Sequence, residues 1–150
     1  MIKVLFVCHG NICRSPMAEF VFKDMVKKAK LEDKFEIASA GTSSEEHGST
    51  PHPRTIEKLN SVGITVSGKY ACQLKKSDYD KYDYFIGMDK YNVSNMLRLF
   101  ELDSDGKVHL LLDFADESRS IEDPWYTHDY DTTYNDVVKG CRALLDSLID

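Results

Sequence analysis

Short apolar runs alternate along this sequence with longer stretches in which apolar residues recur every three or four positions. The first run covers residues 2–7, and a stripe with helical spacing follows over 16–30. A nearly continuous apolar run is typical of a parallel strand that is covered on both faces, whereas the stripe is typical of a helix that packs one side on a core. The chain therefore begins with a predicted strand and a predicted helix.

The same alternation continues to the end of the chain. Three further strand-like runs fall at 35–44, 82–89 and 107–114. Helical spacing returns at 51–62, 93–100 and 134–148. Because strands and helices that alternate in this way build a parallel sheet with right-handed crossovers, we predict a flavodoxin-like, three-layer α/β sandwich: a four-stranded parallel sheet with helices on both faces. Residues 64–76 have no clear pattern, and 113–131 are predicted to form a long polar loop.

Length and composition limit the classes of protein that this chain can belong to. With 150 residues and no repeat or linker, we expect one domain over 1–150. No apolar run approaches the ~20 residues that span a bilayer, and the N-terminus lacks a signal-peptide pattern, so we expect a cytoplasmic protein without a membrane partner. A net charge of -6 argues against nucleic-acid binding. The four cysteines lack the regular spacing of a secreted disulfide framework, so we expect reduced thiols.

Ligands of an open parallel sheet bind beyond the carboxyl ends of its strands. The loops at that edge are expected to share one rim, and they are 8–15, 41–50, 88–92 and 113–131. A loop that joins a strand to a helix also directs unpaired main-chain N–H groups and the positive end of the helix dipole into one small volume. The first of these loops is therefore a predicted anion site.

The residue types of this first loop fit anion binding. Gly10 and Asn11 tolerate the left-handed backbone that inward-facing amides need, and Arg14 offers a planar, permanently charged fork for two oxygens of an oxyanion. Ser15 and Pro16 match the N-cap and the first position of a helix. The predicted phosphate-binding residues are His9, Gly10, Asn11, Ile12, Cys13, Arg14 and Ser15.

Cys8 at the base of this loop gives the anion site a nucleophile. A helix N-terminus and a nearby cation favour the thiolate form of a cysteine, and Ser15 can donate a hydrogen bond to it. A phosphate held in the loop would present its phosphorus to the sulfur for in-line attack, forming a phosphocysteine. Arg14 and the amides would stabilise the transition state, so no metal or cofactor is required.

These motifs resemble the low-molecular-weight protein tyrosine phosphatases over essentially the whole chain. The resemblance lies in "CHGNICRS" after the first strand, "SAGTS", "HPRTIEKLNSVGI", "FIGMD" and a late "DPW". It implies hydrolysis of phosphotyrosine in proteins and of small aryl phosphates, with inhibition by inorganic phosphate and other oxyanions. It also implies that Cys8 is the nucleophile, Arg14 the phosphate clamp, and Asp123 the general acid and then the base.

The residues alone do not choose Asp123 among the aspartates of its loop. They indicate that Pro124 restricts the Asp123 backbone to an extended conformation and that Trp125 can give the carboxyl apolar cover. By resemblance, Trp125 and Tyr126 form one wall of the substrate slot. The other wall, often aromatic in the family, is Glu45 here.

Three further positions refine this comparison with the family. His9 stands where the family usually has an aliphatic residue, which predicts a more polar rim. Ile12 resembles the tyrosine-specific members, whereas the related arginine phosphatases tend to have threonine. Tyr126 lies in a region that is phosphorylated in some relatives, and we hypothesise that a kinase modifies it here.

The remaining cysteines have structural interpretations beside functional ones. Cys13 is either a packing residue or a second thiol that captures oxidised Cys8 as a reversible disulfide. Cys141 lies on the apolar face of the last helix and is expected in the core, and Cys72 has no assignment. A zinc site through Cys8, His9 and Cys13 is disfavoured because no second ligand pair follows.

Two other functions compete with phosphatase activity. Thiol-coupled arsenate reductases resemble these phosphatases but pass electrons through two further cysteines in a mobile segment, where this chain has only Cys72. A non-catalytic phosphotyrosine-binding module would use the same loop but would lack the nucleophile or the acid, and both Cys8 and Asp123 are present.

Overall fold

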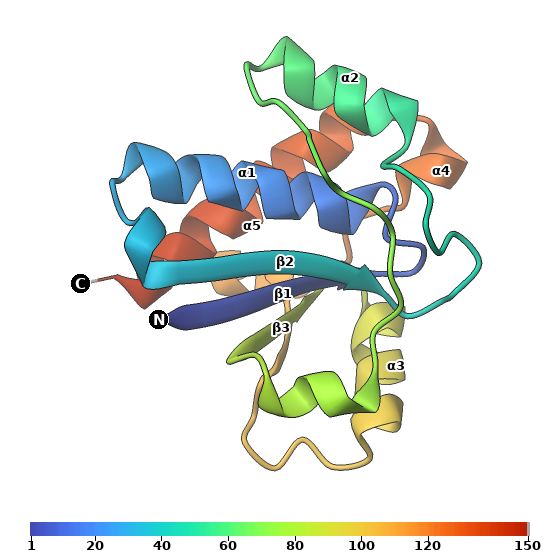
Figure 1. The fold of residues 1–150 in the computed structure, drawn as a ribbon, viewed down its shortest axis with the longest axis vertical. Coiled ribbons are helices and arrows are strands. Elements are labelled where there is room, and N and C mark those ends of the chain that lie inside the picture. Colours follow the sequence, from blue (N-terminus) through green and yellow to red (C-terminus); the bar gives the residue numbers. More distant parts are fainter. Residues whose placement is uncertain (150) are drawn as a thin grey trace.

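The computed structural model describes residues 1–149 and contains a sheet of four parallel strands (Figure 1). The strands are β1 (Ile2–Cys8), β2 (Phe35–Gly41), β3 (Tyr84–Gly87) and β4 (Val108–Leu110). Their order in the sheet is β2-β1-β3-β4, so β1 is a central strand with a partner on each side. This arrangement confirms the predicted parallel sheet.

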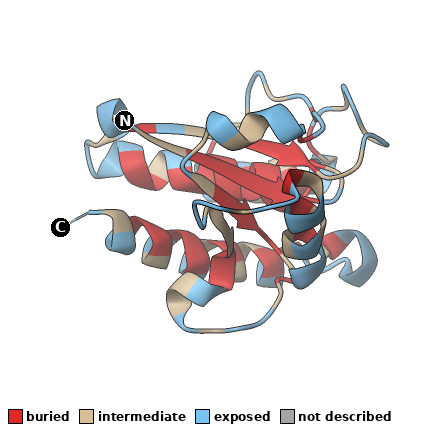
Figure 2. Cartoon of the chain, turned by 90° about the horizontal axis from the view of Figure 1, so that it is seen from below, coloured by how far each residue is buried: buried red, intermediate tan, exposed pale blue. Residues whose placement is uncertain are grey.

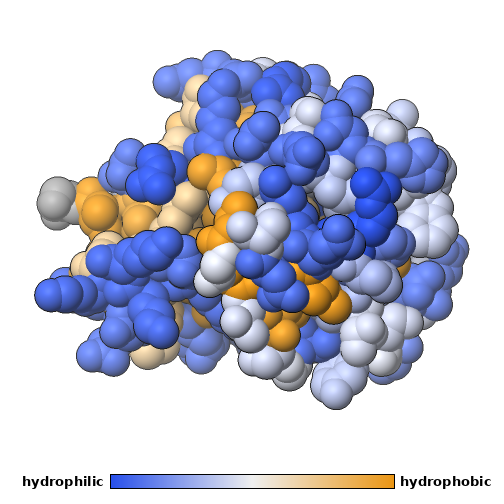
Figure 3. Space-filling view, turned by 90° about the horizontal axis from the view of Figure 1, so that it is seen from above, coloured by the Kyte–Doolittle hydropathy of each residue, from blue (hydrophilic) through white to orange (hydrophobic). Residues whose placement is uncertain are grey.

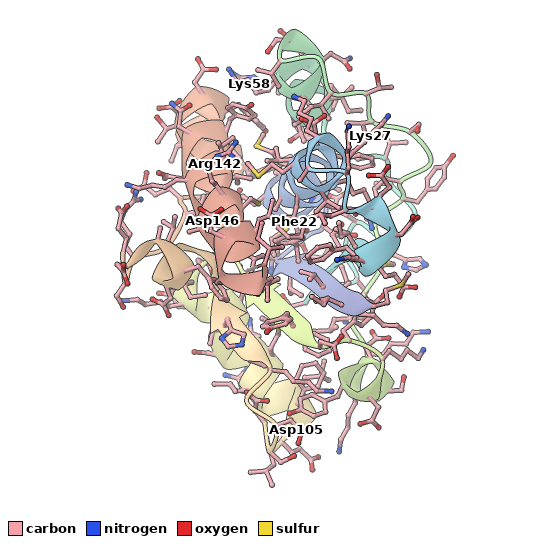
Figure 4. The ribbon with its side chains drawn as sticks, turned by 90° about the vertical axis from the view of Figure 1, so that its left-hand side faces the viewer. Phe22, Lys27, Lys58, Asp105, Arg142 and Asp146 are labelled. Carbon is pink, nitrogen blue, oxygen red and sulfur yellow. The ribbon has the colours of Figure 1, made fainter. Side chains whose placement is uncertain are left out.

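Helices cover both faces of the sheet. One face carries α1 (Arg14–Lys28), α2 (Pro53–Ser61) and α5 (Tyr130–Leu148), and the other carries α3 (Lys90–Phe100). Figure 4, which looks along the sheet, shows these helices on its two sides. Shorter elements are η1 (Glu32–Lys34), η2 (Lys76–Asp80), η3 (Leu111–Ala115) and α4 (Pro124–Thr127). The three-layer architecture therefore agrees with the prediction.

The core explains why the first strand reads as continuously apolar. Val4 and Phe6 face α1 and α5, whereas Leu5 and Val7 face α3, because neighbouring side chains of a strand point to opposite faces. Phe22 of α1 packs edge-on against Phe6 with ring centroids 5.6 Å apart. Figure 2 shows the buried residues gathered in the sheet and on the inward sides of its helices. Both faces of β1 are therefore core.

The structure corrects one local prediction, that Ser15 caps the first helix. The helix already begins at Arg14, and the N-cap residue Cys13 makes no capping hydrogen bond through its side chain. Ser15 lies inside the first turn, and its hydroxyl faces back into the loop toward Cys8 and Asn11. The hydroxyl is engaged by these loop side chains, so it is not available to cap the helix.

Two further segments differ from the expected pattern. The fourth strand ends at Leu110, and the chain turns at once into η3. The unassigned stretch 64–76 passes beside the end of β2, where Gln73 forms an isolated bridge with Gly41. Within residues 1–149, none of the helices is both long and apolar enough to cross a bilayer.

The expected rim is present at the carboxyl ends of the strands. A β-carbon on Gly41, at the end of β2, would lie 2.7 Å from the main-chain oxygen of His9, so only glycine lets β2 approach the first loop this closely. On the face seen in Figure 3, the right-hand side, toward which the strands of Figure 1 point, is mostly hydrophilic, whereas apolar surface lies in the middle of the view and near the C-terminus.

Candidate active site

The first loop surrounds the Cys8 sulfur with hydrogen-bond donors. The main-chain N–H of Asn11 lies 3.3 Å from Cys8 Sγ, and Ser15 Oγ lies 3.0 Å from it. Asn11 adopts the left-handed conformation expected from its residue type, with φ of 58°. Because both groups can donate to the sulfur, the loop is arranged to stabilise a negative charge on Cys8.

Asn11 connects this loop to a buried polar network behind it. Its side-chain amide donates to Ser15 Oγ at 2.8 Å and to Ser39 Oγ at 3.0 Å, and its carbonyl accepts from the main chain of Cys72 at 3.1 Å. Ser39 in turn donates to Glu19 Oε1 at 2.6 Å. The left-handed turn at Asn11 is therefore held by contacts from three separate segments.

Glu19 ends this network as a buried carboxylate with two lysine neighbours. It is 4% exposed and lies 2.5 Å from Lys23 Nζ and 3.7 Å from Lys69 Nζ. A buried carboxylate without such partners would be costly. Sequence reasoning missed Ser39, Lys69 and this role of Glu19, because the contacts join parts of the chain that only the fold brings together.

Arg14 links the first loop to two others at the rim. Its Nη1 donates to Asp89 Oδ2 at 2.7 Å and to the main-chain oxygen of Ile121 at 2.9 Å, and its Nη2 lies 3.5 Å from Asp123 Oδ2. Burial alone would lower the pKa of Arg14, but the negative charges on Cys8 and Asp89 raise it above its ordinary value. Asp89, which sequence reasoning missed, therefore fixes the orientation of the guanidinium.

Asp123 is placed by the short helix that follows it. It is the N-cap of α4, and its Oδ1 accepts from the main-chain N–H of Trp125 at 3.0 Å. Its backbone is extended, with φ of -76° and ψ of 116°, as Pro124 predicts. The Asp123 carboxylate therefore contacts Trp125 by a hydrogen bond to its main-chain N–H.

The predicted site residues meet around one pocket of about 160 Å³. Asn11 and Ser15 are fully buried behind it and act through Cys8. Sequence reasoning missed Glu46, which also lines the pocket. The lining consists of Cys8, His9, Gly10, Ile12, Cys13, Arg14, Glu45, Glu46, Asp123, Trp125 and Tyr126.

The mouth of the pocket is exposed and carries both expected walls. His9 Nε2 lies 3.8 Å from Glu45 Oε2 on one side, and both side chains are more than half exposed. Trp125 and Tyr126 form the other wall, with 51% and 78% exposure. The expectation of a polar rim at His9 thus agrees with its contact to a carboxylate.

His52 supports the aromatic wall, and sequence reasoning did not assign it a role. Its ring lies edge-on to Trp125 at 5.8 Å and stacks on Tyr130 at 5.6 Å. Its Nδ1 caps α2 by accepting a hydrogen bond from the main-chain N–H of Arg54 at 3.1 Å. The main-chain N–H of His52 donates to the main-chain oxygen of Ile12 at 2.7 Å. His52 therefore contacts the first loop and the Trp125 wall together.

The other cysteines differ in burial. Cys13 is buried with its sulfur 3.6 Å from Tyr130 Oη, and burial raises the pKa of this thiol to about 11, a shift that charge on Cys8 and Asp123 increases. Cys141 is fully buried, as predicted, whereas Cys72 is exposed. Across residues 1–149 no three His, Cys, Asp or Glu side chains gather where they could hold a metal ion.

The fold is a parallel α/β sandwich whose pocket holds a cysteine sulfur among hydrogen-bond donors, and comparison with known proteins gives its family. Residues 3–150 match the family described as low molecular weight phosphotyrosine protein phosphatase. The chain belongs to this family, whose named members are protein-tyrosine phosphatases.

Individual relatives agree with this assignment. The low-molecular-weight protein-tyrosine-phosphatase YfkJ of Bacillus subtilis is 39% identical over 99% of this chain and 96% of its own. The corresponding phosphatase of Saccharomyces cerevisiae is 42% identical over 89% of this chain and 86% of its own.

Solved structures of such relatives share the fold. The crystal structure of YfkJ superposes with a TM-score of 0.96 at 39% identity, over 99% of this chain and 94% of that one. The low-molecular-weight protein tyrosine phosphatase of Streptococcus pyogenes gives 0.90 at 40% identity, over 100% of this chain and 95% of that one. The Drosophila arginine phosphatase gives 0.91 at 29% identity, over 99% of both chains.

Proposed function

We propose that this protein hydrolyses phosphotyrosine in protein substrates, and small aryl phosphates, through a phosphocysteine on Cys8. The observation that carries the proposal is the meeting of Cys8, Arg14 and Asp123 in one pocket, with two donors on the Cys8 sulfur. The phosphate lies in the first loop, where main-chain N–H groups and the Arg14 guanidinium bind its oxygens. The loop supplies the positive potential that the anion needs.

In the first step the Cys8 sulfur attacks phosphorus and the bond from phosphorus to the tyrosine oxygen breaks. Protonated Asp123 gives its proton to the departing phenolate oxygen. Arg14 stabilises the equatorial oxygens as their charge redistributes. Because Arg14 Nη2 lies 3.5 Å from Asp123 Oδ2, the clamp and the acid are next to one another before substrate enters.

In the second step Asp123, now a carboxylate, takes a proton from water as the water oxygen attacks phosphorus. The bond from sulfur to phosphorus breaks, inorganic phosphate leaves and the Cys8 thiolate is restored. Ser15 and the Asn11 N–H stabilise the departing thiolate from 3.0 and 3.3 Å. Over the two steps the phosphate ester and one water become the phenol and inorganic phosphate, and Cys8 and Asp123 return to their starting states without a metal or a cofactor.

The walls of the pocket support an aromatic substrate. Trp125 and Tyr126 offer flat apolar surface to a phenyl ring, and Ile12 adds an aliphatic contact at the base. These side chains favour phosphotyrosine over phosphoarginine, although one structural relative is named an arginine phosphatase. Inorganic phosphate and related oxyanions are expected to compete for the loop.

The test is single-turnover hydrolysis of p-nitrophenyl phosphate with a chelator present, followed by acid quench and mass spectrometry. Cys8→Ser should lose turnover, and Asp123→Ala should accumulate phosphate on Cys8. Asp105→Ala is the matched control, because Asp105 (labelled in Figure 4) is an exposed carboxylate in the loop that enters β4, at the end of the sheet opposite the pocket, and its loss should leave the rate unchanged. If the wild type binds phosphate without any turnover, the site is a binding module or serves arsenate, which a reduction assay with a thiol donor then decides.

A further inference from the structure

A second hollow adjoins the proposed active site at His9. It has a volume of about 350 Å³ and lies between the loop after β2, residues 73–74 and the outer side of α3. We call it the Arg98 groove. Its lining residues are His9, Thr42, Ser43, Gln73, Leu74, Asn95, Arg98 and Leu99. His9 lines both hollows, so a chain that leaves the pocket over His9 enters the groove.

The groove is built on the same backbone as the phosphate loop. Thr42 donates to the oxygen of Cys8 at 2.9 Å, and Ser43 donates to the oxygen of His9 at 2.9 Å. On the far side, the N–H of Leu74 donates to Gly41 at 2.7 Å, and the Gln73 amide donates to Thr42 at 3.2 Å. These bonds hold the groove at a fixed position relative to the Cys8 sulfur.

The charge of the groove comes from Arg98. Its Nη1 donates to Asn95 Oδ1 at 3.0 Å, and within residues 1–149 its guanidinium forms no ion pair with a carboxylate. The buried arginine Arg14 and the surface arginine Arg119 both pair with aspartates. In a chain of net charge -6, Arg98 therefore keeps donors for an outside anion.

The lining of the pocket has the opposite charge to the groove. Glu45 and Glu46 line the pocket but not the groove, and Glu45 is 77% exposed with its Oε2 3.8 Å from His9 Nε2. An acidic substrate residue would be repelled over the pocket mouth and attracted by Arg98 in the groove. Buried Leu74 and half-buried Leu99 give the groove apolar surface for the methylene groups of such a side chain.

We propose that the Arg98 groove binds an acidic residue close to the phosphotyrosine of the substrate protein. The Arg98 fork takes the carboxylate, and the phosphotyrosine enters the pocket on the other side of His9. This inference rests on the proposed phosphatase function and adds a substrate class to it: phosphotyrosine sites with Asp or Glu on one side. Because the groove adjoins the pocket at His9, the acidic residue lies on the α3 side of the phosphotyrosine.

The test uses synthetic phosphotyrosine peptides in which one Glu is moved along an otherwise neutral sequence on either side of the phosphotyrosine. Each peptide has a partner with Gln and another with Lys at the same position, and kcat/KM is measured at low salt. The wild type should favour Glu over Gln about two- to fivefold at positions on one side only, the range expected for an exposed charge pair, and added salt should remove the preference.

Arg98→Gln should abolish this ratio, and Arg98→Glu should invert it in favour of Lys. The ratio is taken within each variant, so that a change in overall rate cancels. Lys27→Gln is the matched control: it removes one positive charge at a distant position on α1 (Figure 4), and the wild-type ratio should persist. The proposal that the groove binds an acidic residue is wrong if the wild type hydrolyses Glu and Gln peptides equally well, or if Arg98→Gln keeps the wild-type ratio. If the wild type does not hydrolyse p-nitrophenyl phosphate at all, the proposed phosphatase function is wrong, whatever the peptides show.

Discussion

The back of the pocket and its mouth are built in different ways. At the back, Asn11, Ser15, Ser39 and Glu19 are at most 4% exposed, and they are joined by hydrogen bonds that end on the Cys8 sulfur. At the mouth, side chains such as Tyr126 are largely exposed and have few fixed partners. The buried, hydrogen-bonded part of the site thus surrounds the proposed nucleophile, whereas the exposed part faces the solvent from which a substrate would enter.

This difference predicts large effects at the back and small ones at the mouth. A buried polar group that loses its partner costs its full desolvation free energy, whereas an exposed pair is replaced by water. The effects of substitutions on activity or stability should therefore decrease from the back of the pocket to its mouth. A larger effect at the mouth than at the back would contradict this difference between the two regions.

Arg14→Lys is expected to have the largest effect. Lysine cannot bind two phosphate oxygens as a planar fork while it also reaches Asp89 and the Ile121 carbonyl. We expect kcat for p-nitrophenyl phosphate to fall about 100- to 1000-fold, as for the loss of one transition-state donor. Arg119→Lys is the control, since Arg119 pairs with Glu117 and Asp136 and does not line the pocket. A loss below tenfold in Arg14→Lys would mean that positive charge alone suffices.

Asn11→Ala and Asn11→Gly separate the two roles of Asn11. Both remove the side-chain bonds to Ser15, Ser39 and Cys72, but only alanine must adopt the left-handed backbone against its preference. We expect urea unfolding to show a loss of about 2–3 kcal/mol in Asn11→Gly, with about 1 kcal/mol more in Asn11→Ala. Equal stabilities of the two variants would show that the backbone conformation of residue 11 relaxes without cost.

His52→Asn tests the support of the aromatic wall. Asparagine keeps an oxygen that can cap α2, but it loses the ring that packs on Trp125. We expect KM for aryl phosphates to rise a few-fold with a smaller change in kcat, because this wall is the proposed contact for the substrate ring. Trp125 is the single tryptophan of the chain, so its fluorescence emission should shift to longer wavelength as the ring becomes more exposed to water. His47→Asn, an exposed histidine of the same loop, should leave emission unchanged.

Glu45→Gln is expected to have the smallest effect on small substrates. Its contact with His9 spans 3.8 Å between two exposed side chains, and such pairs contribute little. We expect kcat/KM for p-nitrophenyl phosphate to change less than about twofold, and His9→Gln to add independently in a double-mutant cycle. A coupling as large as tenfold between the two changes would place the mouth among the catalytic parts of the site.

The sequence predicts the parts of the site that are local in the chain. The first loop lies within eight consecutive residues, Cys8 to Ser15, so its residue types predict an anion site without knowledge of the fold. Asp123 required resemblance to a family, because its loop holds four other aspartates that could also serve as an acid. Asp89 and Ser39 could not be found in this way, since each reaches the loop across a long stretch of chain, and Lys69 is likewise distant in sequence from its partner Glu19.

Local signals also fail where tertiary contacts override them. Ser15 followed by Pro16 has the sequence pattern of a helix cap, yet the serine hydroxyl is engaged by Cys8 and Asn11. The apolar run at 107–114 predicts a longer strand than β4. The observed strand is shorter because the second half of the run forms the η3 turn and packs on α5. In both places the residues make a tertiary contact that the local sequence pattern cannot predict.

The central position of β1 determines which part of the molecule opens last. β1 carries Cys8 and has a hydrogen-bonded partner on each side, whereas β2 and β4 are edge strands. Local opening begins where few bonds and few buried contacts hold a segment. In hydrogen–deuterium exchange the amides of β1 should therefore exchange more slowly than those of β4 and of the loop around Glu45. The edges of this protein can fluctuate while the strand that carries the proposed nucleophile stays closed.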